Sequence, residues 1–319
     1  MNRKSKILIA GYRSLIGLNL VQHLKKKGFV NLILADSSKI DFTNPKDAFS
    51  FFKKKRPDNC FIAPIQEGGI GANLAYPAEL IYRNLAIQTN IIHSAWKAKV
   101  KKLIFFASSC VYPADCHQPM KEEYLLKGPL EPTNEPYAVA KIAGIKLCQA
   151  YNRQYGTRFI SVIPATVYGP NDNFDLKTSH VISALLRKFH EAKVKNKSSV
   201  TIWGSGRPRR EFIYAQDLAE ASLFVMQHNN LVELINIGTG VDISIRKLAE
   251  LVKRVVGFRG ELKFDIHKPD GVRRKVLDVS WLSLLGWKAK TDLLSGLKHT
   301  YSWYLSSTSG RVRSKGSIL

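Results

Sequence analysis

Cysteine is scarce in this sequence, and long apolar runs are missing. The four cysteines, Cys60, Cys110, Cys116 and Cys148, include no Cys-x-x-Cys pair, so we expect neither a disulfide framework nor a thiolate metal site. No stretch approaches the ~20 consecutive apolar residues that cross a bilayer. Arg13 interrupts the only apolar stretch near the N-terminus, so we expect no cleaved signal. Together these absences predict a cytoplasmic protein with no bound metal and no membrane insertion.

Acidic residues are also few, and none precedes Asp36. The chain has 49 lysines and arginines against 25 aspartates and glutamates, a formal net charge of +24. Such a charge attracts polyanions: nucleic acid, an anionic membrane surface or a phosphorylated small substrate. The basic residues are dispersed, as in 25–27, 53–56 and 207–210, and no zinc-finger or RNA-binding motif organises them. We therefore expect solvated helix faces, no nucleic-acid partner, and a disordered basic tail at 307–319.

Short apolar runs alternate with longer helical patterns through the first half of the chain. The runs at 6–10, 32–35, 60–63, 103–107 and 159–163 are bounded by segments with helical patterning. Apolar strands separated by helices are typical of a parallel sheet that is covered on both faces. We therefore predict an α/β protein with a Rossmann-type doubly wound parallel sheet.

The alternation loosens after about Pro164. A loop near 168–174 and a helix near 179–192 indicate a smaller α/β lobe, and the run 234–238 suggests a return to the first sheet. We predict two interleaved parts rather than two in tandem. The expected boundaries are 1–165 for the Rossmann domain, with a return segment at about 212–240, and 166–211 with 241–306 for the smaller lobe.

Tyr137 and Lys141 are the most informative pair in the chain. Four residues apart on a predicted helix, a phenol and an ammonium share one face, where the cation lowers the phenol's pKa. Ser108, at the end of the run 103–107, supplies a hydroxyl that holds a carbonyl oxygen against the phenol. This set predicts reduction of a ketone by hydride transfer. An isolated Tyr-x-x-x-Lys is more often a solvated pair on an exposed helix, but here Ser108 and a glycine-bearing turn precede it in the expected order.

A strand, a tight turn and a helix start occupy residues 7–17. Gly11 and Gly17 allow the turn and the close packing that present a helix N-terminus to a pyrophosphate, with Ser14 in place of the middle glycine. We therefore expect a dinucleotide coenzyme.

The residues that would meet the adenosine ribose argue in opposite directions. Asp36, after the second strand, favours NAD because a carboxylate there bonds the ribose 2′-hydroxyl, unless it only caps a turn. Arg13 and Lys39 favour NADP because each can pair with a 2′-phosphate.

Longer segments of the chain match one family. They are 108–113 (SSCVYP), 130–144 (LEPTNEPYAVAKIAG), 151–156 (YNRQYG), 168–174 (YGPNDNF), 179–182 (SHVI), 203–206 (WGSG), 210–212 (REF), 236–242 (NIGTGVD) and 268–271 (KPDG). In these segments the chain resembles GDP-L-fucose synthases, extended short-chain dehydrogenases that act on a GDP-bound 4-keto-6-deoxy sugar. The resemblance covers about residues 5–305.

The resemblance implies two reactions in one pocket: epimerisation of GDP-4-keto-6-deoxy-D-mannose at C3 and C5, then NADPH-dependent reduction of the C4 ketone to GDP-L-fucose. The family's acid and base for epimerisation match Cys110 and His180. From the residues alone, Cys110 is either a thiol activated by a cation or a small buried apolar residue, and His180 is as readily a helix cap or a solvent-facing residue. For reduction, Ser108 positions the C4 oxygen and Tyr137 gives the proton. Lys141 lowers the Tyr137 pKa and holds the nicotinamide ribose.

Binding residues also follow from the resemblance. The coenzyme, NADP(H) with NAD as the alternative, is expected to contact Gly11, Tyr12, Arg13, Ser14, Leu15, Ile16, Gly17, Asp36, Lys39, Ala107, Lys141, Pro164, Ala165, Thr166 and Val167. The GDP part of the substrate is expected to contact Lys188, Trp203, Arg210 and Asp270. A homodimer is implied, through a four-helix bundle built partly from the Tyr137 helix.

Three segments depart from the family's pattern. Gln66 or Glu67 replaces a cation near the substrate, Pro164-Ala-Thr166 stands for the family's Pro-Thr-Asn and so lacks an amide beside the sugar or nicotinamide, and 35–39 lacks the family's arginine. These departures leave open a paralogue that acts on another GDP-4-keto sugar, such as a dideoxy sugar or a heptose for surface polysaccharide. A non-catalytic nucleotide-sensing Rossmann protein is the third hypothesis, and the complete catalytic set argues against it.

Overall fold

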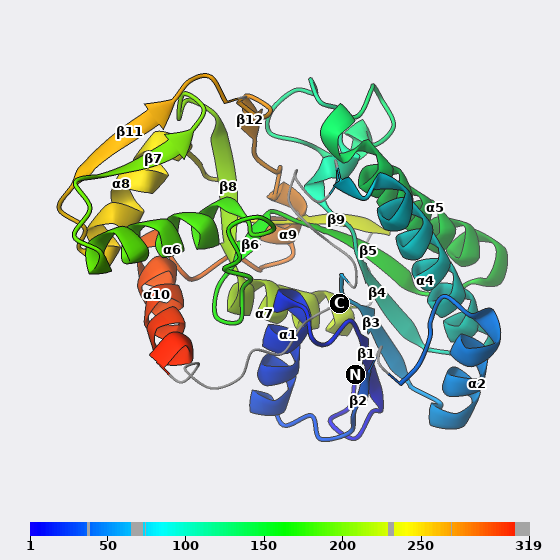
Figure 1. Cartoon of the computed structure of the whole chain (residues 1–319). Helices are drawn as coiled ribbons and strands as arrows, with labels where there is room; N and C mark the ends of the chain where they lie inside the picture. The colour runs from blue at the N-terminus through cyan, green and yellow to red at the C-terminus, as the bar shows by residue number, and fades with distance from the viewer. Residues whose placement is uncertain (37–38, 65–72, 74, 229–232, 269, 310–319) are drawn as a thin grey trace.

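A six-stranded parallel sheet forms the larger part of the computed structural model, which describes residues 1–36, 39–64, 73, 75–228, 233–268 and 270–309 (Figure 1). The strand order is β2-β1-β3-β4-β5-β9, and every neighbouring pair is parallel. The strands are β1 (Ile7–Ala10), β2 (Leu32–Ala35), β3 (Asn59–Ile62), β4 (Lys102–Phe106), β5 (Phe159–Pro164) and β9 (Leu234–Ile237).

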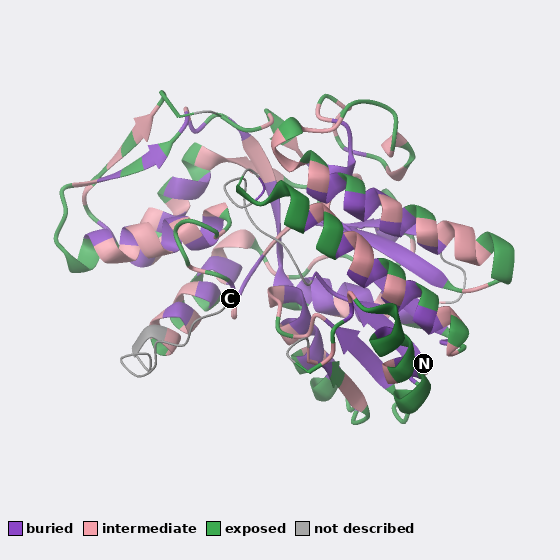
Figure 2. Cartoon of the chain, turned by 45° about the vertical axis from the view of Figure 1, so that its right-hand side comes forward, coloured by how far each residue is buried: buried purple, intermediate pink, exposed green. Residues whose placement is uncertain are grey.

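Helices cover both faces of this sheet. On one side α1 (Leu15–Lys26) packs against α7 (Ala215–Gln227); on the other, α4 (Pro77–Lys97) packs against α5 (Glu135–Tyr155) and α2 (Pro45–Lys55). Every residue of β1, β3, β4 and β5 is buried, which is why these strands are mostly apolar rather than alternating, with Asn59, Lys102 and Ser161 as buried polar exceptions (Figure 2). The predicted doubly wound α/β fold is confirmed.

The second lobe has its own core around Tyr168, Phe189 and Phe212. Its sheet has the order β10-β8-β12, with β6 also paired to β8, and β7 pairs β11 separately. The elements are β6 (Thr166–Tyr168), α6 (Val181–Val194), β7 (Ser199–Trp203), β8 (Arg209–Tyr214), β10 (Asp242–Ser244), α8 (Ile245–Val256), β11 (Glu261–Asp265), β12 (Arg274–Lys275), α9 (Ser280–Leu284) and α10 (Leu293–Ser309). Three short 3-10 helices lie between β4 and α5: η1 (Ser109–Val111), η2 (Glu122–Tyr124) and η3 (Pro132–Asn134).

Two buried polar residues join segments that are far apart in the sequence. Asn236, on β9, donates from its amide to the carbonyls of Met120 and Asp278 and accepts from the Tyr112 hydroxyl at 2.6 Å. Glu211, on β8, accepts backbone N–H bonds from the loop after β9 and from Leu277 after β12. These bonds fix the segments beyond the carboxyl ends of the strands, where ligands bind in open α/β sheets.

Candidate active site

The turn after β1 is built to receive a phosphate group. Gly11 has a φ of 72°, and a Cβ on Gly17 would lie 2.3 Å from the Gly11 carbonyl oxygen, so both positions need glycine. Ser14 caps α1: its hydroxyl donates to the Gly11 carbonyl at 2.8 Å and accepts from Gly17 N–H at 3.1 Å. The first turn of α1 has no acidic residue. A small serine therefore replaces the expected glycine without closing the helix N-terminus, and the site fits a pyrophosphate.

Arg13 and Asp36, which argued opposite ways in the sequence, form an ion pair beside this turn. The Arg13 guanidinium donates to the Asp36 carboxylate at 2.9 Å and to the Tyr12 hydroxyl at 3.0 Å. The Asp36 side chain is 17% exposed and the Arg13 side chain 63%. The Tyr12 hydroxyl and the Asp36 charge both raise the pKa of Arg13. Lys39 is held close by its backbone N–H, which donates to the Asp36 carbonyl.

The predicted catalytic pair is buried rather than solvated. Tyr137 is 8% exposed and Lys141 is 3% exposed, both on α5. The Lys141 ammonium donates to the Phe106 carbonyl at 3.1 Å and lies 5.5 Å from the centre of the Tyr137 ring. An exposed amphipathic pair, the alternative interpretation of this spacing, does not describe these side chains. Instead β4 anchors the lysine beneath the phenol ring.

Ser108 and Cys110 follow β4 directly. Ser108 has an extended backbone at the start of η1, and Cys110 lies within η1, buried against Tyr137 and Ala138. The three side chains therefore meet because the carboxyl end of β4 and the first turns of α5 pack together. Ala107 continues β4 by donating its N–H to the Val162 carbonyl of β5.

The Cys110 thiol lies in a buried but positively charged environment. Burial raises the pKa of Cys110, while a hydrogen bond with Ser108 and the ammonium groups of Lys275 and Lys141 act to lower it. Burial also lowers the pKa of Lys275, a shift that the charges of Cys110 and Glu131 oppose. The structure thus adds to the site a cation that the sequence analysis missed.

Lys275 reaches Cys110 through strand register. It pairs with Arg210 across β12 and β8, and the next residue, Val276, bonds to the side chain of Gln118 and to the backbone of Met120. These contacts fasten β12 to the segment that follows η1. The only signal in the sequence is a basic run, 273–275, that enters the buried pair Val276-Leu277.

His180 occupies the N-cap position of α6, but its side chain does not cap the helix. It is exposed, and the loop before it is fixed by two aspartates: buried Asp172 accepts from Ser183 on the first turns of α6, and Asp175 accepts from the Ser179 backbone. The imidazole is thus placed by an ordered loop and is not used for capping.

The predicted nicotinamide wall lies where the chain leaves the large sheet. Pro164 ends β5, buried Ala165 donates its N–H to the Ile237 carbonyl of β9, and Thr166 and Val167 begin β6. The Asn19 amide of α1 donates to the Pro170 carbonyl at 3.0 Å, which ties the coenzyme turn to this wall.

The four residues predicted for the GDP end lie together in the second lobe. Trp203 ends β7 and is 66% exposed, with the Lys188 ammonium 5.8 Å from its ring centre. Arg210 donates to the Val272 carbonyl, and the charge of Asp270 opposes the lowering of the Arg210 pKa by burial. Lys268, which was not predicted as a site residue, lies 5.4 Å from the Trp203 ring centre.

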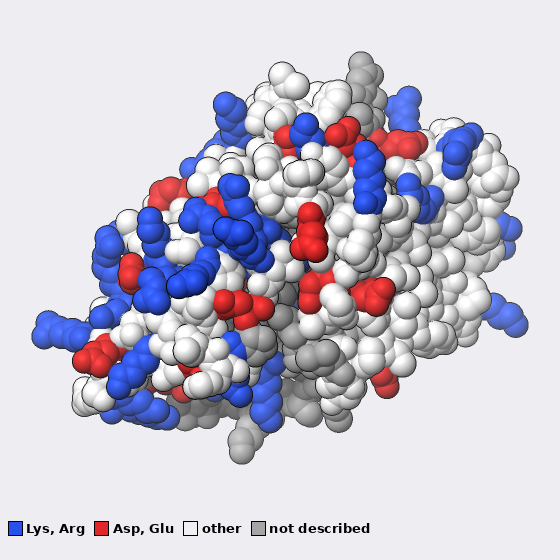
Figure 3. All heavy atoms as spheres, turned by 90° about the horizontal axis from the view of Figure 1, so that it is seen from above, with Lys and Arg blue, Asp and Glu red and all other residues white. Residues whose placement is uncertain are grey.

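Basic side chains gather over the same lobe. Figure 3 shows lysines and arginines crowded on the left half of the face seen from above, while much of the right half is uncharged. An anionic ligand approaching this face is attracted toward the second lobe. Gln66 and Glu67, the predicted departure from the family, lie outside the described residues.

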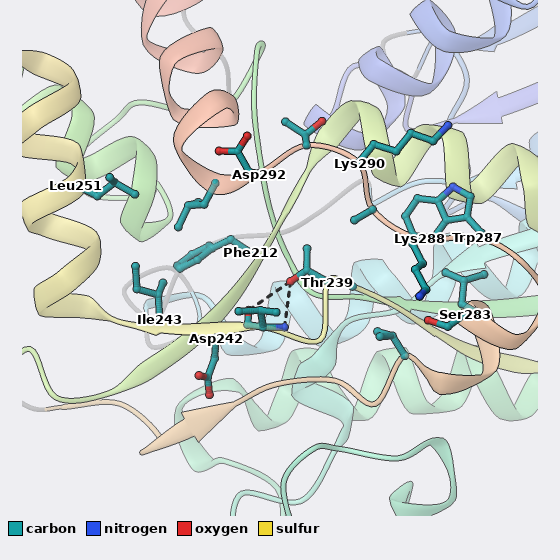
Figure 4. A pocket seen from close by; sticks show the side chains of 17 residues that line it. Phe212, Thr239, Asp242, Ile243, Leu251, Ser283, Trp287, Lys288, Lys290 and Asp292 are labelled. Atoms are coloured by element: carbon teal, nitrogen blue, oxygen red, sulfur yellow. Dashed lines mark hydrogen bonds between the residues drawn. The ribbon is translucent and has the colours of Figure 1, made fainter.

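A cavity of about 810 Å³ lies apart from the catalytic set. Its lining comes from β8, β10, the loop between β9 and β10, α8 and the segment from α9 to the start of α10, including Phe212, Ile243 and Leu251 (Figure 4). None of the residues predicted for catalysis, coenzyme or GDP lines it. The predicted reacting groups therefore lie outside this cavity.

The phosphate-binding turn, the buried Tyr137–Lys141 pair and Ser108 beside it define a dehydrogenase-type enzyme of the extended short-chain class. The family model described as "NAD dependent epimerase/dehydratase family" matches residues 7–238, and the chain belongs to that family. It is 50% identical over 310 residues to GDP-L-fucose synthase 1 of Arabidopsis thaliana, covering 97% of this chain and 96% of the relative. It is 48% identical to GDP-L-fucose synthase of Escherichia coli K12, over 95% of this chain and 98% of the relative.

A solved structure shares the whole architecture. A GDP-mannoheptose C4 reductase from Campylobacter jejuni, solved with NADP bound, superposes with a TM-score of 0.87 at 41% identity and covers 96% of this chain and 99% of that one. The resemblance that the motifs predicted is confirmed.

Proposed function

We propose that this chain is a GDP-L-fucose synthase, which converts GDP-4-keto-6-deoxy-D-mannose to GDP-L-fucose by epimerisation at C3 and C5 and NADPH-dependent reduction at C4. The observation that carries the proposal is the set of buried Cys110, Tyr137 and Lys141 with partly buried Ser108 at the carboxyl end of β4. The chain is 50% and 48% identical to two relatives named GDP-L-fucose synthase, over 97% and 95% of its length, which supports the same substrate.

Reduction follows from the positions of three side chains. Ser108 and Tyr137 hold the C4 oxygen, and Tyr137 transfers its phenolic proton to that oxygen. The Lys141 ammonium, 5.5 Å from the phenol ring centre, stabilises the phenolate left behind. When bound, NADPH supplies the hydride that reaches C4. The ketone thereby gains one hydride and one proton and becomes an alcohol.

Epimerisation uses the same oxygen-binding groups. Removing a proton from C3 or C5 leaves an enolate whose charge lies on the C4 oxygen, where the Ser108 and Tyr137 hydroxyls stabilise it. Cys110 and His180 serve as the acid and base. They come from η1 and from the start of α6, in different lobes, so they can face the sugar ring from two sides.

The proposed coenzyme is NADP(H), as in the Campylobacter reductase solved with NADP. Gly11 to Gly17 would hold the pyrophosphate at the N-terminus of α1, and Arg13 would face the 2′-phosphate. Lys141 would bond the nicotinamide ribose, with the wall 164–167 beside the ring. At the other end of the substrate, Trp203 would stack on guanine while Lys188 and Arg210 contact the diphosphate.

Organisation beyond the site is part of the proposal. The coenzyme domain would comprise 1–165 with 212–240, and the GDP-sugar lobe 166–211 with 241–306. A homodimer would pair α4 and α5, which lie side by side and expose Tyr82 and Tyr155.

Among the described helices, none has the length and apolar composition for crossing a membrane. The four cysteines are free thiols, and a cytoplasmic location is part of the proposal.

A second candidate is a reductase or epimerase for another GDP-4-keto sugar. Thr166, in place of the family's amide, favours it because an amide beside the sugar or nicotinamide is lost. The likeness to a heptose reductase points the same way.

Incubation with GDP-4-keto-6-deoxy-D-mannose in deuterated water separates the two candidates. With NADPH present, we expect GDP-L-fucose that carries deuterium at C3 and C5, identified by NMR. Reduction without deuterium uptake, or no product at all, would contradict the proposal and favour a different GDP-keto sugar.

A further inference from the structure

The Arg13–Asp36 ion pair stands where the fold places the adenosine ribose. β1 and β2 are neighbours with Ala10 opposite Ala35, so the residue after each strand faces the same crevice. Gly11 begins the phosphate-binding turn there, and Asp36 follows β2. In doubly wound folds the residue after the second strand contacts the ribose 2′ position.

The two members of the pair favour different coenzymes. A carboxylate accepts a hydrogen bond from the 2′-hydroxyl of NADH but repels the 2′-phosphate of NADPH. A guanidinium does the reverse, since it can bind the phosphate through two N–H groups. Here Arg13 is already bonded to Asp36 at 2.9 Å and to the Tyr12 hydroxyl at 3.0 Å. Contact with a 2′-phosphate therefore requires Arg13 to give up or share its bond to Asp36.

NADH can bind without breaking the Arg13–Asp36 bond. Its 2′-hydroxyl can donate to Asp36 while the carboxylate, with two oxygens, still accepts from Arg13. Lys39 follows the pair closely in the chain, and its backbone N–H bonds to the Asp36 carbonyl. The pair is thus intact with one coenzyme and disturbed with the other.

We propose that the Arg13–Asp36 pair sets a weak preference between the two coenzymes, so that the chain accepts NADH as well as NADPH. Asp36 lowers the preference for NADPH over NADH, and Arg13 preserves the affinity for NADPH. The inference rests on the proposed coenzyme site but not on the proposed sugar substrate.

Coenzyme binding without sugar tests the inference. Dissociation constants for NADPH and NADH come from fluorescence titration, and calorimetry with adenosine 2′,5′-bisphosphate and 5′-AMP isolates the ribose contact. For the unaltered chain we expect the two reduced coenzymes to bind within about tenfold of each other, as suits an exposed pair. Asp36→Asn should raise the ratio of the NADH dissociation constant to the NADPH dissociation constant by about tenfold or more. The substitution removes the carboxylate that repels the 2′-phosphate and leaves Arg13 to attract it.

Two further variants test the role of Arg13 and control for the change in net charge. Arg13→Gln should weaken NADPH and the bisphosphate by about tenfold or more while changing NADH little. Asp47→Asn, the same charge change at an exposed position in the first turn of α2, should leave both constants within about twofold. A preference for NADPH above about a hundredfold in the unaltered chain, or an unchanged ratio in Asp36→Asn, would overturn the inference. Because no sugar is present, failure of GDP-L-fucose synthesis leaves this test unaffected.

Discussion

Glu211 is the buried carboxylate that holds the two lobes in register behind the site. It is 2% exposed and accepts backbone N–H bonds from Thr239 at 2.5 Å, Gly240 at 2.7 Å and Leu277 at 2.7 Å. Glu211→Gln replaces one carboxylate oxygen, which accepts a hydrogen bond, with an NH₂ group that faces a backbone N–H. We expect this to lower the free energy of unfolding by about 2 kcal/mol. Glu211→Leu leaves all three N–H groups unpaired and should cost about 3 kcal/mol or more. Against a total of about 5–15 kcal/mol, either loss is large.

Urea unfolding followed by far-UV circular dichroism at pH 7 measures these losses. Gly238→Ala is an independent route to the same site, because its Cβ would lie 2.2 Å from a Glu211 carboxylate oxygen. Glu220→Gln is the control, since its partner Lys290 is exposed, and it should cost less than about 1 kcal/mol. A Glu211→Leu variant within about 0.5 kcal/mol of the unaltered chain would refute the reasoning.

The same residue has a pH signature. Burial raises the pKa of Glu211, and the backbone bonds oppose that shift. The folded state therefore binds this proton more tightly than the unfolded state does. The corresponding stability is fully present below the ordinary glutamate pKa and is lost as pH rises through the raised value. In Glu211→Gln that contribution to the pH dependence of unfolding should disappear.

The remaining predictions concern the reacting groups. Tyr137→Phe should lower the rate of C4 reduction by about 10²–10⁴ while deuterium exchange at C3 and C5 stays measurable by NMR; near-normal reduction would show that another group donates the proton. Cys110→Ala should abolish that exchange with an unchanged circular dichroism spectrum, and persistent exchange would remove the thiol from the mechanism. Lys275→Met, in a Cys116→Ser background, should raise the pH at which iodoacetamide modifies Cys110, because a nearby cation lowers a thiol's pKa. Lys275→Arg should restore the original profile and Lys268→Met should not alter it; equal profiles for all three would mean that Lys275 has no electrostatic effect.

The parts of the fold and site that were predictable depend on local patterns. β1, β4 and β5 were evident because strands buried on both faces are largely apolar, and β2 was evident from its apolar run although it lies at the sheet edge and exposes Leu34. Tyr137 and Lys141 were evident because helical spacing alone places them on one face.

The parts that were missed depend on pairing between distant segments. Lys275 approaches Cys110 only because β12 pairs with β8 and is fastened to the segment around Met120, and no local pattern encodes that register. The parallel pairing of β7 with β11, which places Trp203 beside Asp265, is equally non-local. The sequence predicted Arg13 and Asp36 separately as coenzyme-binding residues. The ion pair between them became apparent only in the structure.

The late position of β9 has a consequence for synthesis on the ribosome. β5 needs β9 to cover its outer edge, and α7, which covers one face of the sheet, also comes after Pro164. Until Leu234 and the following residues emerge, β5 is an edge strand that is apolar except for Ser161, the kind of edge at which chains aggregate. Fragments ending near residue 165 should therefore need a chaperone or precipitate, and their solubility should recover once the chain extends past Ile237.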